Sequence, residues 1–349
     1  MRILFVNRSP HLPQLIGGIE TNTHELCKSI IRHGHDAAVL CATNRKGYTG
    51  IKNYISRKIS PKNNWPCDKQ LGYRCFRGHN PQEGILEISE KLNVDAVILQ
   101  GFHPKIIMEI THTNRPVFYY FHFSQRTLEN TKYLKKYQKI ISCSKYISDE
   151  LSSLYSIKSE VIPPLVTPRT MLATNRKPSS IISFGLTKQK GADITMQLAK
   201  RIPEKKFKII QTWSNSKNER KELIARAKKI KNLEILPPKQ DVKFFFNSAL
   251  LLLAPSRDTE GWCRVATEAQ INEIPVIASK VGGLPEAVGA GGICIEDNEN
   301  IDTWERHIRE IINTQSSYKK WQGLAKHSAM REDLNEENIV KKLLTTIKN

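Results

Sequence analysis

The sequence predicts an α/β fold made of two Rossmann-like domains, each a doubly wound parallel sheet. Three observations lead to this prediction. The chain has 349 residues, more than one ordinary core accommodates, and 39% of them are hydrophobic, enough for two cores. Short apolar runs alternate with helical patterns, which is typical of parallel sheets. A proline pair, Pro163-Pro164, and a polar stretch after it divide the alternation into two series.

The first series begins with Ile3–Asn7, a short apolar run typical of a buried strand. A Gly17-Gly18 loop leads to a helix expected from about Thr21 to His33, which Gly34 ends. The segment Thr43–Asn80 lacks clear periodicity and is predicted to be a long functional loop or an insertion. Further strands are expected at Ala37–Ala42, Val94–Gln100, Val117–His122, Lys139–Cys143 and Glu160–Pro164.

The second series starts after Thr167–Ser180, which is expected to be an interdomain linker. Its strands are expected at Ile181–Gly185, Lys206–Gln211, Leu233–Leu236, Ala249–Pro255, Pro275–Ser279 and Gly292–Ile295. Helices are expected at Ala192–Arg201, Asn218–Lys229, Asp241–Asn247, Arg264–Asn272 and Asp302–Thr314. The predicted domains are therefore 1–166 and 181–333, joined by the linker 167–180, with a terminal helix in 334–349.

Charge and composition limit the function classes. The net charge is +20, divided evenly between residues 1–165 (23 Lys and Arg against 13 Asp and Glu) and the remainder (31 against 21). Such a charge favours anionic surroundings, yet no nucleic-acid-binding motif focuses it, so a nucleic-acid partner is not expected. The seven cysteines lack metal-ligand spacing and are expected to be reduced. No apolar run reaches 18 residues, and no signal peptide is evident, so we expect a cytoplasmic protein.

The segment from Leu250 to Val288 contains the residues most suggestive of chemistry. An apolar strand leads into a loop that carries Glu260, and the helix that follows carries Glu268. Carboxylates on the loop and the helix can reach two parts of one ligand. The amides of Gly261, Trp262, Cys263, Arg264 and Val265 lie at or near the helix start, where unpaired N–H groups favour a diphosphate.

This segment resembles the signature of the retaining glycosyltransferase family 4, which has the GT-B fold. The resemblance lies in Glu260-x7-Glu268, Pro275-Val276-Ile277-Ala278-Ser279 and Gly282-Gly283-Leu284-Pro285-Glu286. It implies two domains facing across a cleft, with the nucleotide sugar on the second domain and the acceptor on the first. It also implies that Glu268 holds the donor ribose and that Glu260 contacts the donor sugar. The terminal helix is expected to cross back to the first domain, as in that fold.

Other matches to the family extend over most of the chain. The loop Gly17-Gly18-Ile19-Glu20 is similar to the family's glycine loop, whose amides approach the donor phosphates. Lys190-Gly191 stands where the family has its phosphate-binding lysine. His122 follows a strand as the family's histidine facing the donor sugar does, and His103 is a candidate for the acceptor pocket.

Two departures from the family pattern are visible. The arginine that precedes the family's lysine is absent from Phe184-Gly185-Leu186-Thr187-Lys188, so Lys188 is the candidate substitute or the second cation comes from elsewhere. The family's usual Asn-Gly is replaced by Pro163-Pro164-Leu165.

The resemblance implies transfer with retention at the anomeric carbon, with Glu260, His122 and Lys190 closest to the reaction. The expected donor is a UDP- or GDP-linked hexose or N-acetylhexosamine, and the expected acceptor is a saccharide or a lipid-linked saccharide in bacterial envelope polysaccharide synthesis. No Asp-x-Asp pair occurs, which favours an enzyme without a metal or other cofactor.

Three rival functions were weighed against this one. A sugar-nucleotide epimerase or hydrolase of the same fold would turn over the donor without an acceptor. A dinucleotide-dependent dehydrogenase would require a Gly-x-Gly-x-x-Gly turn after a strand, which is absent. A basic nucleic-acid-binding protein would show salt-dependent affinity for DNA or RNA.

Finally, the charge, the basic segment Lys132–Lys139 and the aromatic residues of Thr43–Asn80 suggest peripheral contact with an anionic membrane surface, on the inner face of the cell membrane.

Overall fold

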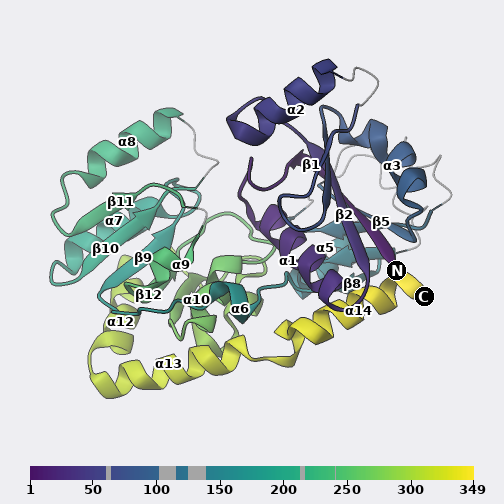
Figure 1. Cartoon of the computed structure of the whole chain (residues 1–349). Coiled ribbons are helices and arrows are strands. Elements are labelled where there is room, and N and C mark those ends of the chain that lie inside the picture. The colour runs from purple at the N-terminus through teal and green to yellow at the C-terminus, as the bar shows by residue number, and fades with distance from the viewer. Residues whose placement is uncertain (60–63, 102–114, 125–138, 213–216, 240) are drawn as a thin grey trace. The chain divides into compact units, whose positions relative to one another are not determined.

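The computed structural model describes all residues except 60–63, 102–114, 125–138, 213–216 and 240 (Figure 1). The chain divides into two compact units. Unit 1 consists of Met1–Leu165 together with Glu336–Asn349, and unit 2 consists of Val166–Asn335. Each unit has its own sheet, so each is described by itself.

Unit 1 is built on an eight-stranded sheet in the order β3-β4-β2-β1-β5-β6-β7-β8. Its strands are β1 (Arg2–Pro10), β2 (Asp36–Ala42), β3 (Cys67–Asp68), β4 (Arg74–Gly78), β5 (Ala96–Gln100), β6 (Val117–Phe121), β7 (Lys139–Ser142) and β8 (Ser159–Val161). Only the short β3 runs antiparallel, against β4, and the other described pairings are parallel. The central strand β5 is buried throughout, and its neighbour β1 is buried from Ile3 to Asn7, as expected where helices cover both faces.

The described helices of unit 1 connect successive strands of its sheet, except for the last one. They are α1 (Gly18–Arg32), α2 (Gly47–Ile59), α3 (Ile85–Leu92), α5 (Lys145–Tyr155) and α14 (Glu336–Lys348). A short 3-10 turn, η1 (Pro81–Gly84), precedes α3.

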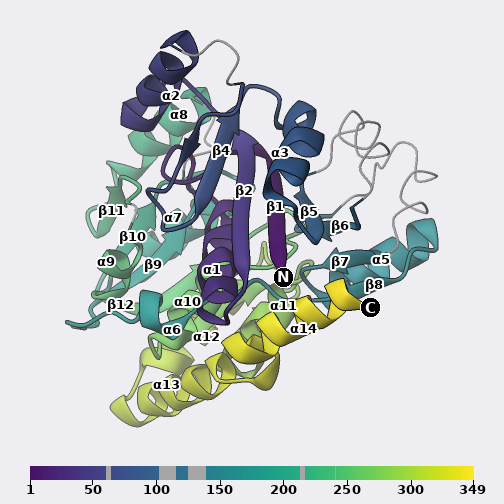
Figure 2. The same ribbon diagram turned by 45° about the vertical axis from the view of Figure 1, so that its right-hand side comes forward.

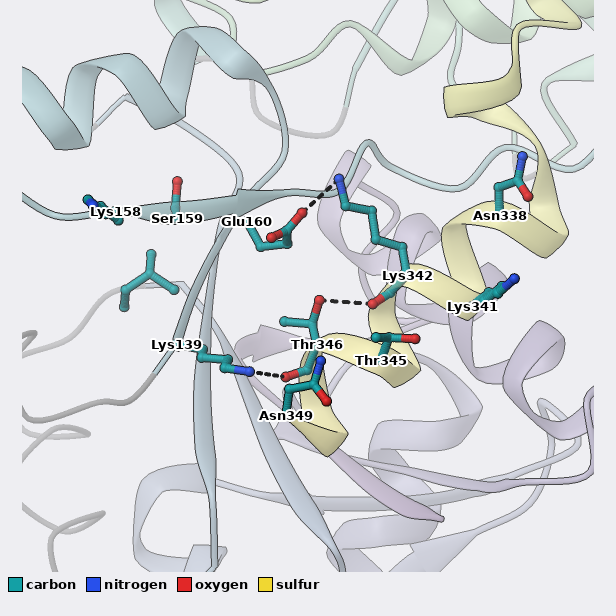
Figure 3. A pocket seen from close by; sticks show the side chains of 11 residues that line it. Lys139, Lys158, Ser159, Glu160, Asn338, Lys341, Lys342, Thr345, Thr346 and Asn349 are labelled. Carbon is teal, nitrogen blue, oxygen red and sulfur yellow. Dashed lines mark hydrogen bonds and ion pairs between the residues drawn. The ribbon is translucent and has the colours of Figure 1, made fainter.

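Helix α14 belongs to unit 1 although it is last in the chain, and it lies beside α1 (Figures 1 and 2). Glu336 accepts hydrogen bonds from Ser29 Oγ (2.5 Å) and from the guanidinium of Arg32. At the other end of the helix, Lys342 Nζ lies 2.7 Å from Glu160 Oε1 and Lys139 Nζ donates to the Thr346 carbonyl (Figure 3). Its apolar face is buried, comprising Ile339, Val340, Leu343 and Ile347.

Unit 2 contains a six-stranded sheet in the order β11-β10-β9-β12-β13-β14, in which all described pairings are parallel. The strands are β9 (Ser180–Phe184), β10 (Lys206–Ile210), β11 (Leu233–Leu236), β12 (Ala249–Ala254), β13 (Val276–Ser279) and β14 (Gly292–Ile295). The helices are α6 (Pro168–Met171), α7 (Ala192–Arg201), α8 (Lys217–Ala227), α9 (Lys243–Phe246), α10 (Arg264–Ile271), α11 (Leu284–Val288), α12 (Ile301–Ile312) and α13 (Gln315–Ala329). The 3-10 turns η3 (Gly289–Gly291) and η4 (Glu332–Leu334) complete the unit.

The core of unit 2 lies between the sheet and its helices. Trp304 is fully buried there, with its Nε1 donating to the Asn298 carbonyl at 2.9 Å. Aliphatic side chains from β9, β10 and β12 surround it in one continuous cluster. This packing fixes the carboxyl ends of the parallel strands, where the loops of an α/β unit bind ligands.

The segment Thr43–Asn80 differs from its prediction. It contains α2, β3 and β4, and β4 pairs with β2 inside the sheet, so the prediction of a long loop was wrong. The strand was missed because a charged residue, Arg77, is fully buried in it and breaks the apolar pattern. Arg77 pairs with Asp68 (Nε to Oδ2, 2.7 Å) and donates to the Leu12 carbonyl (2.7 Å).

The expected linker Thr167–Ser180 also has more structure than predicted. Helix α6 occupies part of it, and Met171 packs with Val166 and Ile271. The Asn272 side chain fixes this segment with two hydrogen bonds. Its Oδ1 accepts from Ala173 N (2.7 Å), and its Nδ2 donates to the Met171 carbonyl (2.9 Å). The segment therefore belongs to unit 2 rather than forming a separate connector.

Candidate functional site

The centre of the candidate site in unit 2 is an ion pair between Lys190 and Glu260. Lys190 lies just before α7, and Glu260 lies in the loop that follows β12. Lys190 Nζ donates to Glu260 Oε1, which also accepts from Ser256 Oγ at 2.5 Å. The lysine side chain is 41% exposed and the glutamate side chain 17%. The ammonium group of Lys190 is thus partly exposed to solvent, whereas the Glu260 carboxylate is largely shielded and is fixed by Ser256.

The pair determines the charge state of the lysine. Burial alone would lower the pKa of Lys190, but the charge of Glu260 and its hydrogen bond outweigh burial and raise that pKa above its ordinary value. Lys190 is therefore fully protonated at neutral pH and can bind an anion.

Three glycines bring these segments close together. At Gly191, which has a φ of +68°, a β-carbon would lie 2.0 Å from the Pro255 carbonyl oxygen. At Gly282, with a φ of +57°, it would lie 2.2 Å from the Glu260 carbonyl oxygen. Gly283 N donates to that same oxygen at 2.7 Å. The glycine turn predicted as part of the family pattern therefore positions the backbone of Glu260.

Arg257 joins the two loops, and no motif in the sequence singles it out. Its guanidinium makes two bonds to Asp193 (2.7 and 3.0 Å) and two to Glu299 (2.5 and 2.8 Å). It also donates to the Lys188 carbonyl at 2.6 Å, and its own amide donates to the Gln189 carbonyl at 2.7 Å. Bidentate pairing of this kind fixes geometry, so Arg257 is a positioning residue rather than the missing diphosphate-binding cation.

Lys188, the candidate substitute for the family's arginine, points toward α8. Its Nζ lies 3.9 Å from Glu222 Oε1, and its side chain is 53% exposed. Its amide donates to Glu219 Oε1 at 2.8 Å. The structure thus places Lys188 near the loop of Lys190 but next to acidic residues, and its role stays a prediction.

Glu268 lies deeper than Glu260. The residue is 4% exposed, and its Oε1 is 3.4 Å from Nη2 of Arg264, one turn earlier on α10. Burial, and after it the charge of Glu260, raises the pKa of the Cys263 thiol to about 12; Lys190 opposes this rise, and Glu268 adds a smaller contribution to it. Glu260, Lys190 and Glu268 therefore act on one small region of unit 2.

Helix α10 begins at Arg264 with Cys263 as its N-cap. The Cys263 side chain makes no capping hydrogen bond, and the first turn contains no acidic residue, so the amides there keep their partial positive charge. Gly261 and Trp262 are buried just before the helix, and Trp262 Nε1 donates to Thr267 Oγ1 at 3.2 Å. Val265 is half-buried in the first turn.

The candidate residues of unit 1 lie at the carboxyl ends of its strands. Gly17 is the N-cap of α1, and a β-carbon on it would lie 2.5 Å from Glu20 Oε2, so the buried Glu20 side chain occupies the space that a larger residue would need. Gly18 opens the helix. Burial raises the pKa of Glu20 to about 7.

His122 follows β6 directly and belongs to a polar chain. Its Nε2 is 2.7 Å from Gln100 Oε1, and Gln100 Nε2 donates to Thr23 Oγ1 (2.7 Å) and to Asn7 Oδ1 (3.2 Å). Because the amide nitrogen of Gln100 is the donor in those two bonds, its oxygen accepts from His122 Nε2–H. The tyrosine ring of Tyr120 lies 4.0 Å from the imidazole. The other predicted histidine, His103, lies outside the described residues.

Comparison with known families identifies the chain. Residues 16–169 match the model described as Glycosyltransferase Family 4, and residues 172–328 match the one described as Glycosyl transferases group 1. Together the two matches extend through both units. The chain belongs to glycosyltransferase family 4.

Two curated relatives match part of this chain. An uncharacterized glycosyltransferase of Methanocaldococcus jannaschii is 31% identical over 52% of this chain and 51% of its own length. A D-inositol 3-phosphate glycosyltransferase of Corynebacterium aurimucosum is 28% identical over 37% of this chain and 33% of its own. The matched part thus spans about half of the first relative and a third of the second.

Solved structures with the GT-B fold match over the full length. A glycosyltransferase from Rickettsia africae superimposes with a TM-score of 0.77 and 20% identity, covering 99% of this chain and 98% of that one. Anabaena HepE in complex with UDP and glucose also gives 0.77, with 15% identity and both chains covered completely. These likenesses establish that the family member has the GT-B fold.

Outside the gaps in the description, no three His, Cys, Asp or Glu side chains lie close enough to hold a metal ion. None of the helices in the described part of the chain combines the length and the apolar character needed to cross a bilayer.

Proposed function

We propose that the chain is a retaining, metal-independent glycosyltransferase. It transfers a hexose or N-acetylhexosamine from a UDP- or GDP-linked donor to a saccharide or lipid-linked acceptor in bacterial envelope polysaccharide synthesis. The observation that carries the proposal is the Lys190–Glu260 pair beside the uncapped start of α10. Family membership supports the transferase activity, because the family is defined by it.

In the proposed donor complex, Lys190 and the first amides of α10 hold the diphosphate. Both carry positive charge toward the same region, and both are fixed before the donor arrives, which is the condition for stabilising charge that develops on a leaving group. Lys190 has three N–H donors, so it can keep its bond to Glu260 while it binds a phosphate oxygen.

Glu260 is proposed to contact the donor sugar and Glu268 the ribose. The two positions differ in a way that suits these roles. Glu260 is partly exposed on a loop, and Glu268 is buried on the helix, where a bond to a ribose hydroxyl would be shielded from water. His122, held by Gln100, is proposed to act near the reacting sugar.

Thermal stabilisation by a panel of nucleotide sugars would identify the donor. A ligand present at 100 times its dissociation constant stabilises the folded protein by about 2.7 kcal/mol, which a melting curve readily resolves. The donor found in this way is then incubated with candidate saccharide acceptors, and the anomeric configuration of the product is read by NMR.

An α-linked product from an α-linked donor, unaffected by a chelator, is the expected result. An inverted product, or loss of turnover with the chelator, would contradict the corresponding part of the proposal. Consumption of the donor at the same rate with and without acceptor would favour the epimerase or hydrolase instead.

A further inference from the structure

Helix α2 has its polar and apolar faces inverted. Its buried residues are Thr49 (4% exposed), Gly50 and Asn53 (4%). Large apolar side chains are exposed instead: Tyr48 (74%), Ile51 (53%), Ile55 (49%) and Ile59 (77%). At about 100° per residue, positions 48, 51, 55 and 59 fall on one stripe of the helix. We refer to these four residues as the α2 stripe.

The inner face of α2 packs closely against the rest of unit 1, so the helix cannot rotate about its axis to bury the α2 stripe. A β-carbon on Gly50 would lie 2.3 Å from the Asn44 carbonyl oxygen. Gln14 Nε2 bonds the same carbonyl at 2.9 Å and Asn44 Oδ1 at 3.1 Å. The helix stands at the end of unit 1 remote from α14 (Figures 1 and 2).

The sequence around the stripe has one sign of charge. Residues 37–67 contain six Lys and Arg and no Asp or Glu. Among the described residues of this segment, Arg45, Lys46, Lys52 and Lys58 are exposed. An apolar stripe bordered only by cations is typical of helices that lie in the headgroup region of an anionic membrane.

A small pocket beside the helix contains a buried polar group without a partner. The pocket has a volume of about 250 Å³ and is lined by Thr43, Asn44, Arg45, Gly50, Asn53, Tyr54, Lys58 and His79. Asn53 Nδ2 is buried and has no hydrogen-bond partner among the described residues. The Arg45 guanidinium and Lys58 Nζ lie 5.0 and 5.9 Å from the centre of the Tyr54 ring. The pocket therefore combines an N–H donor with two cations, which suits a phosphate oxygen.

We propose that the α2 stripe and this pocket form a docking site for an anionic lipid bilayer. The apolar side chains enter the interface, and one lipid phosphate occupies the pocket between Arg45, Lys58 and Asn53. The site would hold unit 1 at the surface where a lipid-linked acceptor resides. Only this biological purpose depends on the proposed function. Lipid binding itself does not, because it requires no catalysis.

Charge decides between a membrane and a protein partner as the occupant. A protein partner would have to present acidic residues placed to match these cations, because potentials across a protein interface are complementary. The described residues of α2 and its flanks present cations only. A bilayer with anionic headgroups satisfies both the stripe and its border without a specific arrangement of acidic residues.

The test is co-sedimentation with phosphatidylcholine vesicles that contain or lack phosphatidylglycerol. Wild-type protein should partition strongly onto the anionic vesicles only. Ile51→Asp combined with Ile55→Asp should abolish partition, and Lys58→Ala should weaken it about fivefold, which corresponds to roughly 1 kcal/mol for one cation near the surface. Asn53→Ala should weaken it by a similar or smaller factor, since it removes one donor to the phosphate.

Matched substitutions elsewhere serve as controls. Leu154→Asp changes a similarly exposed (52%) apolar residue on α5, and Lys158→Ala removes an exposed lysine far from the stripe in sequence; neither should affect partition. Circular dichroism melting shows whether each variant is folded. If Ile51→Asp with Ile55→Asp partitions as the wild type does, or if neutral vesicles bind equally well, the proposal is wrong.

A second arm separates lipid from free phosphate. Inorganic phosphate is titrated against the protein alone, with melting temperature as the readout. Stabilisation by phosphate that Asn53→Ala removes, without any partition onto vesicles, would replace the membrane by a soluble anion and overturn the proposal. Donor binding is measured in parallel for the wild type and for the stripe variants. If the wild type binds no nucleotide sugar, the proposed function is contradicted and lipid docking is unaffected.

Discussion

At the scale of single residues, Glu20 is the clearest case of a group whose environment changes its chemistry. It lies in the first turn of α1 and is 6% exposed, and burial raises the pKa of its carboxyl from 4.5 to about 7. In the unfolded chain the carboxyl loses its proton near pH 4.5, whereas the folded protein keeps it up to about pH 7. Glu20 therefore reduces stability progressively as the pH rises through this window, by roughly 3 kcal/mol above it.

Substitution Glu20→Gln should remove this dependence. The variant is expected to match the wild type at about pH 4 and to exceed its stability at about pH 8. Urea unfolding at several pH values measures the difference, and Glu87→Gln, which changes an exposed glutamate of α3, is the control. A difference between Glu20→Gln and wild type that stays constant with pH would contradict the assigned burial effect.

Gly282 tests how strictly Glu260 is positioned. An alanine there requires a left-handed backbone and also places its β-carbon 2.2 Å from the Glu260 carbonyl oxygen, so the Glu260 loop must move. A displacement of about 1 Å at a reacting group can cost on the order of 100-fold in rate. Gly282→Ala should therefore lower turnover strongly.

Gly34→Ala is the matched control, because Gly34 has a φ of +79° but no atom within 4 Å of the added carbon. It should cost about 1–2 kcal/mol of stability from backbone strain and leave turnover unchanged. Equal turnover in Gly282→Ala and Gly34→Ala would show that the close approach of residue 282 to the Glu260 carbonyl is not needed for turnover.

At the scale of elements, β4 depends on a buried ion pair. The Arg77 side chain is fully buried, and the Asp68 side chain is 4% exposed. Arg77→Met leaves Asp68 without its charged partner in the interior, and we expect a loss of about 3–5 kcal/mol. Arg77→Met with Asp68→Leu should recover much of that loss, because no uncompensated charge remains. Chemical denaturation measures both variants, and a double variant less stable than the single one would contradict this account.

The same strand shows what the sequence can and cannot predict about elements. Strands β12 and β14 were predicted within one residue because they are short apolar runs between turn residues. Strands β10 and β11 were predicted equally well although lysines or a glutamate interrupt their apolar residues. The strand β4 was missed because its arginine is stabilised by Asp68 and by two loop carbonyls. These partners lie 9 to 66 positions away in the sequence, so a local pattern does not reveal them. Helix α2 was missed because its exposed and buried faces are inverted.

Those residues of the candidate site that belong to local motifs could be predicted from the sequence. Glu260, Glu268 and the glycine turn follow from a motif in one stretch of chain, and Lys190 follows from a second, separate match, Lys190-Gly191. Arg257 was not predicted, because its role lies in four bonds to Asp193 and Glu299, which are 64 and 42 residues away. The expected substitution of the family's arginine by Lys188 stays a prediction.

At the scale of the whole molecule, unit 1 is completed by the last helix of the chain. Leu343 of α14 is fully buried, although most of unit 1 ends at Leu165. Leu343→Ala should destabilise unit 1 by about 2–5 kcal/mol, whereas Thr345→Ala, at an exposed position of the same helix, should have little effect. Hydrogen exchange locates the loss: amides of α1 and β8 should exchange faster, and those of residues 166–335 should not. Faster exchange confined to residues 166–335 would contradict the assignment of α14 to unit 1.

The central claim is that Lys190 stabilises the departing diphosphate from its place beside Glu260. Steady-state kinetics of Lys190→Ala with the identified donor and acceptor tests it most directly, with Lys280→Ala as the control, since Lys280 also pairs with a glutamate in unit 2 but at an exposed position. We predict that Lys190→Ala lowers kcat about 10²–10³-fold, by analogy with removal of one preorganised donor, and that Lys280→Ala does not lower it. Turnover and donor affinity near wild type in Lys190→Ala would contradict the account.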